Sequence, residues 1–148
     1  MPSRKAILIA DDCEEDAQIM RRAFQKSGCN VPLLFVKDGQ EALDYLSGTG
    51  EYSDRTAHPL PRLMLLDLKM PKVDGFDVLE WLHEHPKLRV LPVTVLTSSN
   101  LDWDVDRAYH LGANSYVVKP SSFAGFVEIV EGLRNYWIEI NRPPSAVA

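Results

Sequence analysis

The sequence predicts a doubly wound α/β domain in which a five-stranded parallel sheet forms the middle of three α/β/α layers. Short apolar runs alternate with amphipathic segments five times along the 148 residues. The strand segments are almost continuously apolar, which is typical of parallel strands covered by helices on both faces. We therefore expect one domain over residues 1–148, with its core at about residues 4–140.

The elements follow from local patterns. β-branched and apolar runs predict strands at residues 6–10, 33–36, 63–67, 93–97 and 115–118. Apolar side chains recur at three- and four-residue steps after each strand, which predicts five helices, the last from Phe123 to Trp137. Residues 47–61, rich in Gly, Pro and polar side chains, are expected to form an extended loop. Pro143 and Pro144 should end the last helix and leave residues 141–148 as a flexible tail.

Composition excludes several classes of function. A net charge of −5 and the absence of a Lys/Arg cluster argue against a nucleic-acid partner. The longest apolar runs are far shorter than a membrane span and no signal peptide opens the chain, so we expect a cytoplasmic protein without a membrane partner. Cys13 and Cys29 lie near the two ends of the first predicted helix, ~24 Å apart at 1.5 Å per residue, and cannot form a disulfide.

Polar and charged side chains follow four of the five predicted strands, at their carboxyl ends. They are Asp11, Asp12, Asp67, Thr97 and Lys119. Because the carboxyl ends of parallel strands meet at one edge of the sheet, we expect these side chains to converge there. Each one alone also has an ordinary structural explanation: Asp12 with Glu15 could form a helix capping box, and Lys119 could be a surface charge.

Asp67 is the hardest of these residues to explain structurally. It follows an apolar strand that should bury it, and an Asp is rarely buried without a partner. Carboxylates brought together repel one another, and a hard divalent cation and a nearby ammonium group compensate their charge. Mg²⁺ and Lys119 meet both needs, and Mn²⁺ is an alternative cation.

Five sequence fragments together resemble the response-regulator receiver family of two-component systems, in order and in spacing. The fragments are Asp11-Asp12, Asp67 followed by Met70-Pro71-Lys72-Val73-Asp74-Gly75, Leu96-Thr97, Gly112-Ala113, and Tyr116-Val117-Val118-Lys119-Pro120. The resemblance covers roughly residues 4–140 and implies the flavodoxin-like arrangement, with a βα unit repeated five times. It also implies a signalling domain whose only reactions are self-phosphotransfer and autodephosphorylation, rather than an enzyme.

The resemblance assigns a role to each site residue. Asp67 would be the phosphoacceptor for a histidine kinase, with Thr97 and Lys119 binding the phosphoryl oxygens. Asp12, Asp67 and the backbone carbonyl of Lys69 would ligate the magnesium directly, and Asp11 through water. These roles agree with phosphoryl transfer, which needs charge neutralisation and in-line positioning.

The same resemblance implies a conformational switch. On phosphorylation Thr97 would move inward and Tyr116 would occupy the space that it leaves. The alternative for Tyr116 is a half-buried strand aromatic. The family usually has a cis peptide at the position of Lys119-Pro120, so we expect one here.

The sequence departs from the commonest receiver pattern at Lys69, at Ser98 and in the loop at residues 47–61. The first two flank the path of attacking water and could alter the dephosphorylation rate. The loop, together with Leu96-Thr97-Ser98-Ser99, resembles the small single-domain regulators of phytochrome-type histidine kinases; an ordinary loop insertion is the alternative.

The expected partners follow from the absence of an output domain after the fifth helix. The signal would leave by contact with a downstream protein or by onward phosphotransfer as a phosphorelay intermediate. Tyr109, Tyr136 and Trp137 could form part of a homodimer surface across the fourth and fifth helices, although Trp137 could equally belong to the core.

Two rival functions are weaker on the residues. A haloacid-dehalogenase-like aspartyl phosphatase usually needs a second Asp two positions after the nucleophile, where this chain has Lys69. A nucleotide or flavin site lacks a Gly-rich turn after the first strand.

Overall fold

The sheet lies at the centre of the molecule and confirms the predicted topology. The computed structural model describes residues 5–147, so the expected domain limits at residues 1–4 and 148 lie outside the described part. Five parallel strands pair in the order β2-β1-β3-β4-β5. Their bounds are β1 Ile7–Ala10, β2 Leu33–Val36, β3 Leu63–Leu66, β4 Val93–Thr97 and β5 Ser115–Val118.

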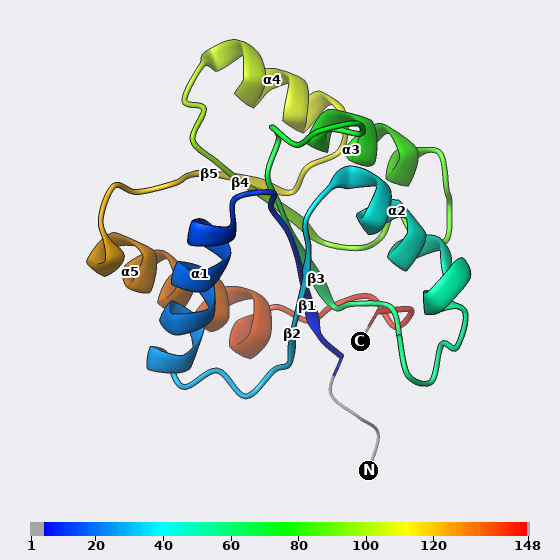
Figure 1. Ribbon diagram of the computed structural model, residues 1–148, viewed down its shortest axis with the longest axis horizontal. Helices are drawn as coiled ribbons and strands as arrows, with labels where there is room; N and C mark the ends of the chain where they lie inside the picture. Colours follow the sequence, from blue (N-terminus) through cyan, green and yellow to red (C-terminus); the bar gives the residue numbers. More distant parts are fainter. Residues whose placement is uncertain (1–4, 148) are drawn as a thin grey trace.

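Helices cover both faces of this sheet, which makes the three predicted layers. Figure 1 shows α1 and α5 together on one side and α2 and α3 on the other, with α4 beside α3. The helices are α1 Glu14–Lys26, α2 Gly39–Ser47, α3 Gly75–His83, α4 Asp102–His110 and α5 Phe123–Leu133. Within residues 5–147, none of the helices has the length and apolar character needed to cross a membrane.

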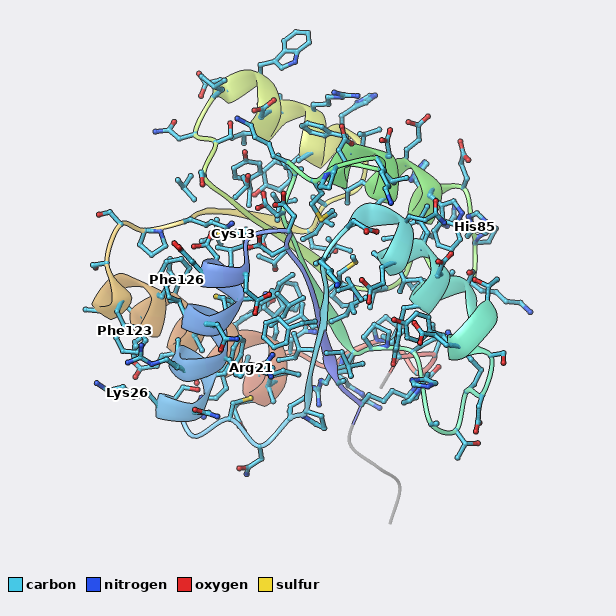
Figure 2. The ribbon with its side chains drawn as sticks, in the orientation of Figure 1. Cys13, Arg21, Lys26, His85, Phe123 and Phe126 are labelled. Atoms are coloured by element: carbon cyan, nitrogen blue, oxygen red, sulfur yellow. The ribbon has the colours of Figure 1, made fainter. Side chains whose placement is uncertain are left out.

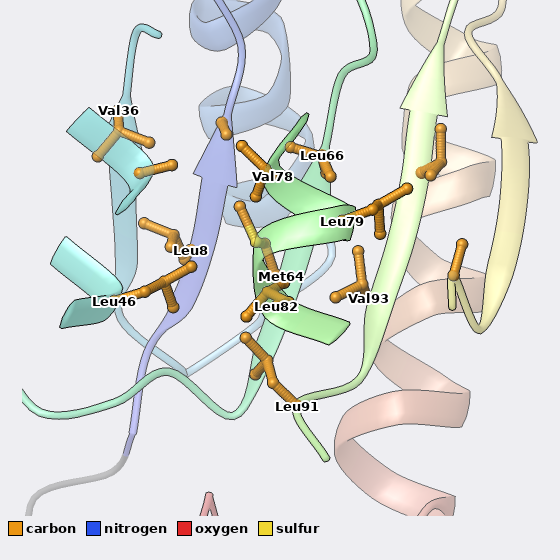
Figure 3. Packing of buried hydrophobic residues seen from close by; sticks show 14 of the residues in the cluster. Leu8, Val36, Leu46, Met64, Leu66, Val78, Leu79, Leu82, Leu91 and Val93 are labelled. Carbon is orange, nitrogen blue, oxygen red and sulfur yellow. The ribbon is translucent and has the colours of Figure 1, made fainter. Parts of the chain in front are cut away.

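Alternate residues of the central strands supply two separate cores. Leu8 of β1 and Met64 of β3 point toward α2 and α3, where they pack with Val78 and Leu79 (Figure 3). Ile7 and its neighbours of the opposite parity pack instead under α1 and α5. This two-residue alternation buries both faces of β1 and β3, as expected for a parallel sheet between helices.

The layer of α1 and α5 is closed by aromatic and aliphatic contacts. Phe24 of α1 and Phe126 of α5 are buried in the same cluster. At its rim, Arg22 and Lys26 of α1 lie over the ring of Phe123, at 5.0 and 5.9 Å from its centre. Figure 2 shows Lys26 and Phe123 beside each other at the end of this layer that is remote from Cys13.

Helix starts are mostly capped by side chains. Asp74 accepts a hydrogen bond from the backbone of Asp77 in a capping box at α3, and Asp38 and Ser122 cap α2 and α5. The capping-box alternative for Asp12 is wrong: α1 begins after Cys13, and within residues 5–147 no side chain caps it. Asp12 is therefore available to the cluster of carboxylates at the sheet edge.

The extended loop before β3 is folded against α2. A short 3₁₀ helix, η1 (Gly50–Tyr52), opens it. The guanidinium of Arg55 donates hydrogen bonds to the carbonyls of Tyr45 and Leu46, at 2.8 and 3.1 Å, at the end of α2. The Tyr45 carbonyl also accepts from the N–H of Gly48, the C-cap residue of α2, at 3.2 Å, and the bonds from Arg55 hold the loop against this end of the helix.

The described part of the C-terminal segment packs against the domain. After α5 the chain continues as a π-helix, η2 (Arg134–Ile140), and the prolines then end the helix as predicted. The chain then turns back, with the Val147 N–H bonded to the Pro144 carbonyl at 3.0 Å, and the flexibility of residues 141–148 stays a prediction. Val147 is buried in the core under α2 and α3, and burial of this apolar side chain explains why the tail packs.

Candidate functional site

The backbone brings four of the predicted site residues to the same edge of the sheet. Ala10 of β1 pairs with Leu66 of β3, so the next residues, Asp11 and Asp67, leave the sheet together. The Asp67 N–H donates to the Ala10 carbonyl at 2.9 Å, and the Lys119 N–H donates to the Thr97 carbonyl at 2.8 Å. These bonds continue the parallel ladders beyond the strand ends and fix where each side chain starts.

Three carboxylates gather at this edge. Asp11, Asp12 and Asp67 each offer an oxygen, and these oxygens all lie within 4.8 Å of one another. Asp11 and Asp67 are buried and Asp12 is exposed. Oxygen ligands of this charge and spacing suit a hard divalent cation such as Mg²⁺ or Mn²⁺, with the exposed side open to water.

Lys119 neutralises part of this charge. Its Nζ lies 2.8 Å from an oxygen of each of Asp11, Asp16 and Asp67, and only 7% of its side chain is exposed. Burial acts to lower the pKa of Lys119, but hydrogen bonds to the three carboxylates outweigh it and raise the pKa above its ordinary value. The lysine is therefore cationic at neutral pH.

The expected cis peptide before Pro120 is wrong. The Lys119–Pro120 bond is trans, the form that is lower in energy by ~0.5–1 kcal/mol for most X-Pro bonds. The long lysine side chain reaches Asp11 and Asp67 from this backbone, so its contact with the carboxylates does not depend on a cis bond.

The surroundings of Asp11 disfavour the ionised form of its carboxyl group. Burial raises the pKa of Asp11, and this effect is larger than the opposing hydrogen bonds from Lys119 and from the Cys13 N–H. A carboxyl group whose pKa is higher in the folded than in the unfolded state favours folding when protonated, and this contribution is lost as the pH rises through the folded-state pKa. Ionised Asp11 therefore lowers stability at neutral pH.

Asp11→Asn is expected to raise the thermal unfolding midpoint by about 3 °C at pH 7 without divalent cations, because it removes this unfavourable charge. Differential scanning calorimetry of the variant and the wild type measures the change. Asp106→Asn, on the exposed surface of α4, is the matched control. A lower midpoint for Asp11→Asn would contradict the account of the charge balance.

The two predicted switch residues differ in their hydrogen bonding. The Thr97 hydroxyl is buried and has no hydrogen-bond partner within the described part of the chain. The Tyr116 hydroxyl donates to the Ser99 carbonyl at 2.9 Å, and burial raises its pKa. An unsatisfied buried hydroxyl is unfavourable, so Thr97 carries a donor that an added acceptor would satisfy.

The loop after β3 forms one wall of an open pocket of about 480 Å³. The Lys69 N–H donates to an Asp67 oxygen at 3.3 Å, while the Lys69 side chain is exposed at the rim. Gly75 begins α3, and its N–H donates to the Leu68 carbonyl at 2.9 Å. The expected ligand role of the Lys69 carbonyl stays a prediction.

Sequence reasoning missed two features of the site. Asp16 contacts Lys119 from the first turn of α1, and no helical spacing signals this contact, because Asp12 lies before the N-cap residue Cys13. The Ser99 hydroxyl donates to Asp104 of α4 at 2.6 Å and so ties the loop after β4 to that helix. Ser and Asp five residues apart across a loop carry no signal either.

The fold and this site define the class of protein. The model of the response regulator receiver domain family matches residues 7–131, and the chain belongs to that family. It is a two-component signalling domain.

Among curated proteins, the chain is 41% identical over 138 residues to the probable methanogenesis regulatory protein FilR2 of Methanothrix harundinacea, covering 93% of this chain and 86% of that protein. It is also similar to response regulators of known structure. The Mn²⁺-bound response regulator Rcp1, from Synechocystis, superimposes with a TM-score of 0.86 at 33% identity, over 95% of this chain and 99% of that one. The phosphorylated cyanobacterial phytochrome response regulator RcpA gives 0.89 at 33% identity, over 96% and 99%.

Proposed function

We propose that this receiver domain accepts a phosphoryl group from a histidine kinase on Asp67, in a reaction that requires Mg²⁺. The observation that carries the proposal is the contact of Asp67 with Lys119 at 2.8 Å, beside two further carboxylates. One buried Asp thus lies between a cation and a set of metal ligands, which is what transfer to a carboxylate needs. The Mn²⁺ in Rcp1 and the phosphorylated state of RcpA support the proposal.

Each residue of the site has a separate role in the phosphoryl transfer. An Asp67 carboxylate oxygen forms a bond to phosphorus as the bond from phosphorus to the kinase histidine nitrogen breaks, which gives an acyl phosphate. Asp11, Asp12 and Asp67, with the Lys69 carbonyl, would hold the metal. The metal supplies charge neutralisation when bound. Lys119 pairs with the phosphoryl oxygens, and Thr97 donates its unsatisfied hydroxyl to one of them.

The same proposal includes the switch. Once Thr97 turns toward the phosphoryl group, Tyr116 can leave the Ser99 carbonyl and pack in the vacated space. The loop after β4, tied to α4 by Asp104, would then change the surface of that helix.

The partners are proposed on the same basis. Likeness to the phytochrome response regulator RcpA favours a phytochrome-type kinase as the partner, and a phosphorelay intermediate is the alternative. The cytoplasm is the proposed location. A homodimer across α4 and α5 would use Tyr109 of α4 and Tyr136 of η2, which continues α5; each is 49% exposed. Trp137 packs against the core under α1 and α5 and contributes less to that surface.

Intact-protein mass spectrometry after incubation with acetyl phosphate tests the phosphotransfer. We expect one phosphoryl adduct on the wild type with Mg²⁺, no adduct after chelation, and no adduct on Asp67→Asn. Asp106→Asn, exposed on α4, is the control and should be labelled like the wild type. Labelling that is independent of Mg²⁺, or unchanged in Asp67→Asn, would refute the proposal.

A further inference from the structure

Asp16 is a charged residue in contact with Lys119. The reaction described above gives Asp16 no role. It lies in the first turn of α1, which begins at the sheet edge beside Cys13 (Figure 2). Its Oδ2 is 2.8 Å from Lys119 Nζ, the same distance as the oxygens of Asp11 and Asp67. The ammonium donates hydrogen bonds to Asp16 and Asp67 and forms an ion pair with Asp11.

Asp16 differs from the other two carboxylates in what it can bind. Among the described residues, the carboxylates close enough to share a metal are those of Asp11, Asp12 and Asp67, and Asp16 is not one of them. Its side chain is 24% exposed, against 7% for Asp11 and 8% for Asp67. Its contact with the pocket therefore runs through Lys119.

The contacts of Lys119 must change during the reaction. If Asp67 accepts a phosphoryl group and Asp11 helps to hold the metal, the oxygens that now bind the ammonium acquire other partners. Asp16 takes part in neither event, so its contact is the one that can persist. A charge-assisted hydrogen bond is about twice as strong as a neutral one, and a buried lysine chain without an anchor has many rotamers to explore.

We propose that Asp16 is a positioning residue. It holds the Lys119 ammonium beside Asp67 while the other partners of the ammonium change from carboxylate to phosphoryl oxygens. This inference rests on the proposed function of Asp67. Asp16 acts through the lysine and does not touch the reacting atoms. Its anionic charge is needed, because an amide at this position would hold the ammonium more weakly.

Asp16→Asn and Asp16→Glu test the inference, with Glu15→Gln as the matched control. Glu15 is exposed in the same turn of α1, so its neutralisation has the same effect on the helix dipole. Phosphorylation by acetyl phosphate at saturating Mg²⁺ should be about tenfold slower in Asp16→Asn, and within about threefold of the wild type in Asp16→Glu and Glu15→Gln.

A second readout does not depend on phosphorylation. In the ¹⁵N-lysine NMR spectrum of the unmodified protein, the ammonium signal that disappears in Lys119→Met belongs to Lys119. We expect Asp16→Asn to broaden or shift this signal, and Asp16→Glu to restore it, whereas Glu15→Gln leaves it as in the wild type. Circular dichroism confirms that each variant is folded.

The two readouts separate the inference from the proposed function. If the wild type takes no phosphoryl group, the proposed function fails, and the NMR signal alone decides whether Asp16 holds the lysine. If the wild type is phosphorylated, the inference requires both the slower rate and the changed signal in Asp16→Asn. Either one unchanged, or an equal effect in Glu15→Gln, would overturn it.

Discussion

Replacing Lys119 with methionine is expected to lower the free energy of unfolding by about 3 kcal/mol at pH 7 without divalent cations. Methionine preserves much of the side-chain volume but removes the cation that contacts Asp11, Asp16 and Asp67. Removing one partner from a buried ionic cluster leaves the remaining charges buried and uncompensated. This destabilises the protein by more than the intact cluster stabilises it. Urea unfolding monitored by circular dichroism measures the loss.

The way in which the unfolding free energy of Lys119→Met depends on pH and on Mg²⁺ identifies the cause of its lower stability. Without the ammonium, carboxylates such as Asp11 should have higher pKa values in the folded state, so the deficit should shrink as the pH falls and they are protonated. Mg²⁺ should also reduce the deficit, because it supplies positive charge at the same place. Lys87→Met, on an exposed lysine, is the control. A deficit that is the same at pH 5 and pH 7 would point to lost packing instead.

Gly75→Ala is the second substitution with a large expected effect. A Cβ at Gly75 would lie 2.7 Å from the Leu68 Cα and still closer to the Asp67 carbonyl oxygen. Both obstacles are backbone atoms, which cannot turn aside as a side chain can, so the start of α3 and the loop after β3 must separate. We expect a loss of about 2 kcal/mol of stability and phosphorylation about tenfold slower, because the displaced backbone carries Asp67.

Gly132→Ala is the matched control for that substitution. Gly132 lies in α5, and among the described atoms none comes within 4 Å of its added Cβ. Alanine there should raise stability by about 0.5 kcal/mol through its higher helix propensity and leave phosphorylation unchanged. Chemical denaturation and the rate of adduct formation measure both variants. Wild-type rates in Gly75→Ala would show that contact at Gly75 does not position Asp67.

The sheet and the pocket were predictable because they depend on strong local signals. A strand that is buried on both faces, such as Leu63–Leu66, is recognised by its continuous run of apolar residues. The topology then places the next residue, Asp67, at the sheet edge. The β3 strand ends one residue earlier than predicted, which leaves Asp67 free of the strand and within reach of Lys119.

The features that the sequence did not reveal depend on competition between distant groups. Asp12 and Glu15 satisfy the pattern of a capping box, yet the carboxylate of Asp12 joins Asp11 and Asp67 instead. The tail after the two prolines has a composition typical of disorder, but Val147 finds a place in the core under α2 and α3 that only the folded chain creates. Local patterns contain no information on either competition.

Locating the modified residue tests the central claim most directly. Acyl phosphates are reduced by borohydride, so a phosphorylated aspartate becomes homoserine and can be found by peptide mass mapping. After treatment with acetyl phosphate and Mg²⁺, we expect homoserine at position 67 and unmodified aspartate at positions 11, 12 and 16, with no homoserine when Mg²⁺ is chelated. Homoserine at another position, or none despite Mg²⁺, would contradict the assignment of Asp67 as the phosphoacceptor.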